Sequence, residues 1–295
     1  KIGKRDSIAS IFAVDESPEA EEIPQPKAYF SIVRYKRALS QDSFLGLIYT
    51  GREQEERYNR VFGSDGQIRL SQSSVLNLHA FGSFSRESDA SPEAEGHVFG
   101  ADYFYDTRKL EVSLAVQDIS RDFQTDTGYI TRTGLSRFSA AFVRKFYPRS
   151  KFLRRIAPAV YTSQLKDQPS GLYETENSLS LNFVAVRSTR LTLAYIYSTE
   201  VFLAQRFNTS GWIVQTGSQL TKFFTFSISL RNGKAIRYSE APFQARGTRA
   251  ASSVVFQPSE KINLTLNFTY SDLYRDSDSE KIYDYSIART RLTYQ

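Results

Sequence analysis

The segment Ile262-Asn-Leu-Thr-Leu-Asn-Phe-Thr-Tyr270 alternates apolar and small polar side chains without interruption. A repeat of two residues is that of an extended strand with one apolar face and one polar face. The turn-forming residues Pro258–Lys261 precede this strand, and the polar residues 276–281 follow it. A short turn, a long alternating strand and a polar loop therefore make one structural unit.

This unit recurs along the whole chain and predicts about sixteen strands. Short turns alternate with longer polar loops, and they are centred near residues 41, 73, 108, 149, 188, 221 and 259. The predicted strands span residues 5–14, 28–38, 43–52, 58–71, 75–86, 96–106, 110–122, 135–146, 152–165, 174–186, 190–202, 211–220, 223–232, 247–257, 262–274 and 282–295.

Strand length and connection pattern favour an all-β fold, an antiparallel up-and-down transmembrane β-barrel of the outer membrane. Strands in soluble sandwiches usually have about five or six residues, whereas a tilted strand needs roughly 9 to 11 residues to cross the hydrocarbon layer. The mean hydropathy of −0.41 agrees with this interpretation, because alternating strands average out. A soluble all-β domain would show the same alternation and remains the alternative.

Composition limits the classes of function. The chain has 295 residues and no cysteine, which excludes disulfides, thiolate metal sites and cysteine nucleophiles. The net charge is +6, but lysine and arginine are scattered along the chain, so we expect no nucleic-acid partner. We treat residues 1–295 as one barrel domain. Because the chain starts at Lys1 and ends at Gln295 without a terminal aromatic residue, we expect it to be the middle of a longer barrel.

Tyrosine and tryptophan recur near the predicted strand ends, where the interfacial girdles of membrane barrels lie. The apolar sides also include glycine and alanine, such as Ala80 and Gly82, where a tightly packed protein core would want larger residues. Outer-membrane lipids are therefore the expected partners of these faces. The predicted interface aromatics are Tyr49, Tyr105, Tyr195, Tyr197, Trp212 and Tyr270.

The polar faces carry charges that we expect to line the barrel interior. Sixteen or more strands enclose more space than side chains can fill, so a channel or a plug is required. Opposite charges on adjacent strands would cross-link a plugged interior, whereas an arginine-rich path would favour anionic solutes. The clearest candidates are Asp65, Arg69, His79, Asp102, Glu111, Arg137, Arg231 and Arg249; Arg34, Lys36, Arg289 and Arg291 lie in strands that alternate less cleanly.

The two histidines are the natural candidates for a hydrolase. His79 shares a polar face with Ser83, and His97 begins the next strand, which also carries Asp102. The sequence pairs neither histidine with a nucleophile, so we predict no catalytic residue. No set of His, Asp and Glu has metal-ligand spacing, and we expect neither metal nor cofactor. Gly63-Ser-Asp-Gly66 precedes no helix, so it predicts close backbone packing or a bend rather than a phosphate site.

The acidic segment Asp15–Glu22 lies in a long predicted loop. Charge runs of this kind are usually solvated. Bridging by divalent ions to anionic lipid head groups is the alternative interpretation.

Six segments resemble one family. They are Lys1–Ile11, Val33–Arg37, Ser43–Arg52, Tyr58–Asp65, Asp126–Arg132 and Leu292–Gln295. Together they resemble the barrel-forming C-terminal domain of unknown function that follows a family-9-type carbohydrate-binding module in Bacteroidetes and related bacteria. The resemblance implies a location in the bacterial outer membrane and a periplasmic, carbohydrate-binding-like domain upstream. It implies no catalytic residue.

Three functions remain open from the sequence. The first is a channel or uptake component, for a glycan or an anionic solute, working with a periplasmic glycan-binding domain. The second is a closed barrel that serves as membrane anchor or assembly platform. The third is an outer-membrane hydrolase using His79 or His97. Nothing in the sequence sets the oligomeric state.

Overall fold

The computed structural model describes residues 3–16 and 27–294, which form an antiparallel, up-and-down, all-β structure. No helix in this part of the chain is long and apolar enough to cross a membrane. Residues 17–22 of the acidic segment lie outside the described residues. The strands are β1 (Asp6–Asp15), β2 (Ala28–Ser40), β3 (Ser43–Gln54), β4 (Arg57–Ser71), β5 (Ser74–Arg86), β6 (Ala94–Asp106), β7 (Leu110–Ile119), β8 (Leu135–Arg144), β9 (Leu153–Asp167), β10 (Tyr173–Ala185), β11 (Arg190–Phe202), β12 (Gln205–Asn208), β13 (Gly211–Thr221), β14 (Phe224–Arg237), β15 (Phe243–Ser259), β16 (Ile262–Arg275) and β17 (Lys281–Tyr294).

All sixteen long strands expected from the sequence are present, and the short strand β12 is added beside the end of β11. The expected end of the strand at 110–122 is wrong, because β7 stops at Ile119 and residues 120–134 form a loop. Strands β14 and β15 are longer than expected, because their ladder continues as far as the pair Arg237 and Phe243. In this extension the backbones of the two strands still pair, although apolar and polar side chains no longer alternate.

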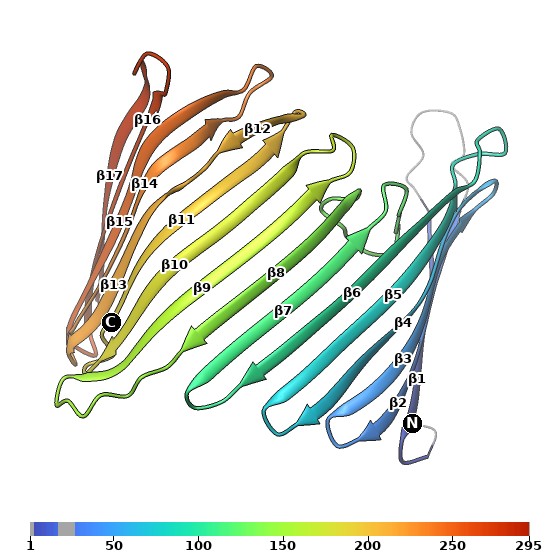
Figure 1. Ribbon diagram of the computed structural model, residues 1–295, viewed down its shortest axis with the longest axis horizontal. Coiled ribbons are helices and arrows are strands. Elements are labelled where there is room, and N and C mark those ends of the chain that lie inside the picture. Colours follow the sequence, from blue (N-terminus) through green and yellow to red (C-terminus); the bar gives the residue numbers. More distant parts are fainter. Residues whose placement is uncertain (1–2, 17–26, 295) are drawn as a thin grey trace. The chain divides into compact units, whose positions relative to one another are not determined.

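The connections differ at the two ends of the strands, as the sequence predicts. Two-residue turns join β2 to β3, β4 to β5 and β15 to β16 at one end. Longer segments, such as 87–93 and 120–134, lie at the other end. Figure 1 shows β2 to β5 side by side in chain order, with their short turns at one end of the strands. We call the two ends the turn end and the loop end.

The chain divides into two compact units. Unit 1 contains β1 to β6 together with residues 113–139 and 165–171; unit 2 contains residues 107–112, 140–164 and those from 172 onward. In unit 1, successive strands from β1 to β6 pair antiparallel. In unit 2, β10 pairs with β11, β11 with β13, and the pairing continues strand by strand to β17.

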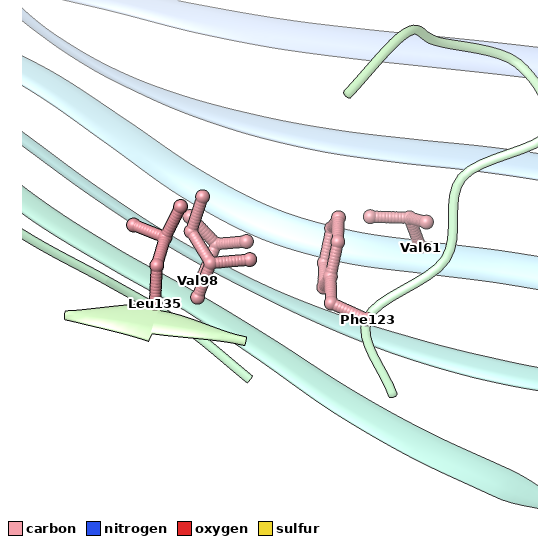
Figure 2. Packing of buried hydrophobic residues seen from close by; sticks show 5 residues of the cluster. Val61, Val98, Phe123 and Leu135 are labelled. Carbon is pink, nitrogen blue, oxygen red and sulfur yellow. The ribbon is translucent and has the colours of Figure 1, made fainter. Parts of the chain in front are cut away.

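The buried apolar cluster of unit 1 lies where the loop 120–134 folds against the strands. Val61 on β4 and Val98 on β6 pack with Ile119, Phe123 and Leu135 from β7, the loop and β8. Figure 2 shows Phe123 beside Val61, and Leu135 beside Val98. This small core ties the loop to the sheet.

Candidate functional site

In unit 1 the strand register separates a polar face from an apolar face. Lys36, Gly46, Asp65 and His79 stand opposite one another on β2, β3, β4 and β5. Because side chains alternate along each strand, residues two positions away share this side. We call it the polar face of unit 1 and the opposite side its apolar face.

The apolar faces of both units leave large hydrophobic side chains uncovered. Leu47 is 58% exposed and Phe99 53% exposed in unit 1, and Ile228 is 45% exposed in unit 2. A soluble sandwich would bury such a face against a second sheet. Within each unit the described residues provide no such cover, so these faces need the hydrocarbon chains of a lipid bilayer to cover them.

Arg34 and Asp65 form a bidentate ion pair across the polar face of unit 1. Arg34 Nη1 lies 2.6 Å from Asp65 Oδ1, and Nη2 donates to Oδ2 at 2.7 Å. The pair has to cross β3, where Gly46 lies beneath it. A Cβ on Gly46 would lie 2.6 Å from both Arg34 Nη2 and Asp65 Oδ1, so glycine leaves the room that the ion pair needs.

The loop 120–134 folds back over the polar face of unit 1. Asn59 on β4 holds it with both ends of its amide: Nδ2 donates to the carbonyl of Gln124 at 3.1 Å, and Oδ1 accepts from the N–H of Asp126 at 2.9 Å. Ser83 Oγ on β5 accepts from the N–H of Gln124 at 3.2 Å. Because Asn59 is only 2% exposed, these bonds are made away from solvent, where an unpaired group is costly.

The carboxylate of Asp126 adds an electrostatic tie to the same loop. Arg52 Nη1 donates to it at 2.9 Å, and Arg57 Nη2 lies 3.5 Å away. On β6, Gly96 lets the loop backbone approach, since a Cβ there would lie 2.2 Å from the Cα of Phe123. The loop end of this polar face is therefore covered by ordered chain.

Mostly small side chains line the polar face of unit 2, and two hollows lie on this face. Thr192, Gln215, Ser229, Ala251 and Thr269 form one row across β11, β13, β14, β15 and β16. A hollow of about 680 Å³ lies over this row. A second hollow of about 770 Å³, toward the turn end, shares Arg190 and Thr192 with the first. The two hollows give unit 2 a continuous polar depression.

Several guanidinium groups on this face have no acidic partner among the described residues. Arg231 and Arg249 stand directly opposite each other on β14 and β15, an arrangement of like charges that destabilises strand pairing. Arg231 Nη2 donates to the carbonyl of Thr209 at 2.9 Å. Among the described residues, neither guanidinium group reaches a carboxylate. The same holds for three more arginines of this face: Arg190, Arg289 and Arg291.

Most of the other charged residues that were predicted to line the interior contact partners on neighbouring strands or turns. Asp102 lies opposite Asn77 on the polar face of unit 1, and the ammonium of Lys36 lies 3.6 Å from the ring centre of Phe44. That any of these residues faces a water-filled interior stays a prediction. Three more make an ion pair or hydrogen bond: Arg69 with Asp42 at 2.9 Å, Arg137 with Gln117 at 3.0 Å, and Glu111 with Lys145 at 3.0 Å.

The aromatic residues that were predicted for the membrane interface lie on the apolar faces. Tyr49 stands opposite Phe62 with ring centres 4.8 Å apart, and Tyr195 opposite Trp212 at 4.7 Å. Their depth in a membrane stays a prediction. The remaining members of the set on these faces are Tyr105, Tyr197 and Tyr270.

His97 is paired with an acid and not with a nucleophile. Its Nε2 lies 3.0 Å from Asp118 Oδ1. Ser136 Oγ donates to the other oxygen of the same carboxylate. The carboxylate therefore stands between imidazole and hydroxyl, whereas nucleophilic catalysis needs these two in contact.

His79 offers no catalytic contact either. Its ring stacks on Phe81 with centres 5.7 Å apart. In the described part of the chain it makes no hydrogen bond to Ser83 or Asp102. The described residues also contain no cluster of three or more His, Cys, Asp or Glu that could hold a metal ion.

That the loop folds over the polar face was not expected from the sequence, which predicts only a connection between the strands at 110–122 and 135–146. The hydrogen bonds that hold it to the strands join residues between 23 and 74 positions apart. One signal was present: Val61, Phe81 and Val98 are apolar residues that lie together on the face that carries Asp65 and His79. Such an apolar patch on a polar face has to be covered by another part of the chain.

The fold is similar to that of solved outer-membrane proteins. No family model matches the sequence, and no curated protein is similar to it at a significant level. The ferric enterobactin receptor PfeA of Pseudomonas aeruginosa shares 8% identity and has a TM-score of 0.55, over 92% of this chain and 53% of that one. The siderophore receptor PirA of the same organism shares 8% identity (TM-score 0.55, over 98% and 62%), and the copper transporter OprC shares 10% (TM-score 0.57, over 99% and 60%).

These similarities define the class of protein. The chain has the antiparallel up-and-down fold of outer-membrane β-barrels, which confirms the fold class and the outer-membrane location expected from its sequence. It spans between 53% and 62% of the length of these three proteins. The short turns of such barrels are periplasmic and the longer loops extracellular, and the loop end of this chain corresponds to the extracellular end of that fold.

Proposed function

We propose that the chain forms the wall of an outer-membrane uptake barrel that favours anionic solutes. The observation that carries the proposal is the facing pair Arg231 and Arg249, which has no acidic partner among the described residues. Arginines directly opposite each other repel, and an anion between them would relieve that repulsion. The fold similarity to receptors and a transporter supports uptake at the level of fold.

The polar depression of unit 2 supplies the space that a solute needs. Its floor of Ser229, Ala251 and Thr269 projects little into the hollow. Two opposite unit charges 4 Å apart attract each other by about 1 kcal/mol in water and by about 4 kcal/mol near a protein surface. Several unpaired guanidinium groups along one path therefore give a sizeable preference for anions.

The loop 120–134 would restrict entry from the extracellular end. Its hold on Asn59, Ser83 and Arg52 fixes its position over the polar face of unit 1. The polar face beneath it is internally neutralised by the pair Arg34 and Asp65. We assign this face the role of a rigid wall, and the arginine-bearing face of unit 2 the role of the selective one.

The test is the ion selectivity of the complete protein in planar bilayers under a potassium chloride gradient. We expect a reversal potential of the sign for anion preference. Replacing both arginines, as R231Q/R249Q, should lower the anion-to-cation permeability ratio by roughly two- to fivefold per charge removed. R246Q, on the opposite face of β15, is the matched control and should leave selectivity unchanged. Cation preference in the unmodified protein would overturn the proposal.

A closed barrel that acts as an anchor is the second candidate, and the loop-covered, ion-paired face of unit 1 is the observation that favours it. Complete absence of ion current would replace the uptake proposal with this one. A glycan-binding domain upstream in the gene product is a further proposal that rests on sequence resemblance alone. The sequence of the complete gene decides whether it exists.

A further inference from the structure

A separate cavity opens on the apolar face of unit 2, at its loop end. Its volume is about 690 Å³. Aromatic and polar residues line it together, and those that matter here are Tyr195, Trp212, Asn232, Lys234, Arg246 and Asp272. None of them belongs to the polar face on which the uptake proposal rests.

The strand register places this cavity at the boundary of the apolar band. Trp212 stands opposite both Tyr195 and Asn232, and Lys234 stands opposite Arg246. These residues lie near the loop ends of β13, β14 and β15. Ten residues of a strand tilted by about 45° rise about 23 Å, close to the height of about 25 Å of a barrel's apolar band. The cavity therefore opens at the level of the outer-leaflet head groups.

Trp212 and Tyr195 form an exposed aromatic platform in the cavity. Their ring centres are 4.7 Å apart and their planes are inclined by 53°. Trp212 is 63% exposed, although it is the largest apolar side chain in the protein. Rings of this kind accept the weakly positive C–H face of a sugar, because the face of the π-system is negative.

Polar groups surround the platform at hydrogen-bonding distance from one another. Lys234 Nζ contacts both carboxylate oxygens of Asp276 at 2.6 Å. Arg246 Nη2 donates to Ser279 Oγ at 2.8 Å and has no carboxylate partner in the described residues. Asp272 Oδ1 accepts from the N–H of Thr248 at 2.6 Å. Arg246 is thus the group left free to bind an anion.

The surface below the cavity continues into the apolar band. Val214 and Leu230 stand opposite each other on β13 and β14, two residues from Trp212 and Asn232 toward the turn end. A ligand held in the cavity would have this apolar surface beside it. A ligand that fits both surfaces has a polar head with a sugar ring and an acidic group, together with hydrocarbon chains.

We propose that the cavity binds the acidic sugar head group of an outer-leaflet glycolipid. The sugar ring packs on Trp212 and Tyr195, the acidic group binds Arg246, and the acyl chains lie along Val214 and Leu230. A phosphoglycerol lipid offers the charge and the chains but no ring, and a free sugar phosphate offers no chains. The proposal is independent of anion uptake, because it uses the opposite face of the strands.

Trp212 is the only tryptophan of the chain, so its fluorescence reports on this cavity alone. The complete protein in detergent micelles is titrated with lipid A, a phosphorylated and acylated glucosamine disaccharide. We expect a saturable change in Trp212 emission. Phosphatidylglycerol should bind at least tenfold more weakly, and glucosamine 1-phosphate should not saturate at the same concentrations.

Substitutions separate the cavity from the rest of the surface. R246Q should weaken lipid A binding about tenfold, because it removes a charge-assisted hydrogen bond. R249Q, three residues away on the other face of β15, is the matched control and should bind like the unmodified protein. Equal binding of phosphatidylglycerol, or an equal effect of R246Q and R249Q, would overturn the proposal. Both arginines are exposed, so neither variant should impair folding.

Discussion

Asn59 is the residue on which the position of the loop 120–134 depends most. Its side-chain amide is matched to one carbonyl and one N–H of the loop, and no other side chain of this face of β4 makes both bonds to it. The side chain is almost fully buried, so water cannot replace either bond. Asn59 thus holds the loop over the polar face together with Ser83 and Arg52.

Replacing Asn59 should release the loop. Asn59→Leu leaves two backbone groups of the loop without partners, at a cost of about 1 to 3 kcal/mol each. We expect faster proteolytic cleavage within 120–134 in the reconstituted protein. The control is Asn77→Leu, on the same polar face but without a contact to the loop. Equal cleavage of the two variants would show that Asn59 does not hold the loop.

Gly96 and Gly82 provide a comparison of two glycines on neighbouring strands. A Cβ on Gly96 would lie 2.2 Å from a backbone atom of Phe123, whereas a Cβ on Gly82 has its nearest neighbour at 3.9 Å. Gly96→Ala should therefore destabilise the loop contact by about 1 to 3 kcal/mol, and Gly82→Ala should have little effect. Thermal unfolding in detergent measures both. A larger effect at Gly82 would contradict the packing described here.

At the scale of elements, the alternating sequence predicts the presence of the long strands, but it does not predict where they stop at the loop end. The sequence predicted 223–232, where Ser, Thr and Arg alternate with apolar residues, and 247–257, but not the extension of β14 and β15 to Arg237 and Phe243. The extension is held by backbone pairing between strands, which does not require an alternating pattern. The four-residue strand β12 is too short to show any period.

The connection between β16 and β17 should loosen in acid. Asp278 accepts from the N–H of Glu280 and from Arg275, each at 3.0 Å, and these bonds hold the pKa of Asp278 below its usual value. Because the folded-state pKa is depressed, the stabilisation is present above pH of about 4 and is lost as the pH falls through the folded-state pKa.

Hydrogen exchange of residues 276–280, corrected for the intrinsic rate at each pH, measures this loosening. We expect protection to fall as the pH drops below about 4 in the unmodified protein. Asp278→Asn should lower protection at neutral pH and remove the acid-dependent step. An unchanged step in Asp278→Asn would assign the titration to another group.

At the scale of the molecule, the two units treat charge differently. Arg34 and Arg52 in unit 1 have carboxylate partners, whereas Arg231 and Arg249 in unit 2 have none among the described residues. The sequence predicted charged polar faces, because alternation assigns residues to faces. It could not predict which charges pair, because pairing depends on register between strands that are distant in sequence, as for Arg34 and Asp65, 31 positions apart.

The central claim is that lipid covers the apolar faces and water the polar ones. The chain has no cysteine, so single cysteines can be placed along β14 at Phe226, Ser227, Ile228 and Ser229 and reconstituted in bilayers. A charged, water-soluble thiol reagent should modify the variants at Ser227 and Ser229 and leave those at Phe226 and Ile228 unmodified. Equal modification at all four positions, or the reverse alternation, would contradict the account.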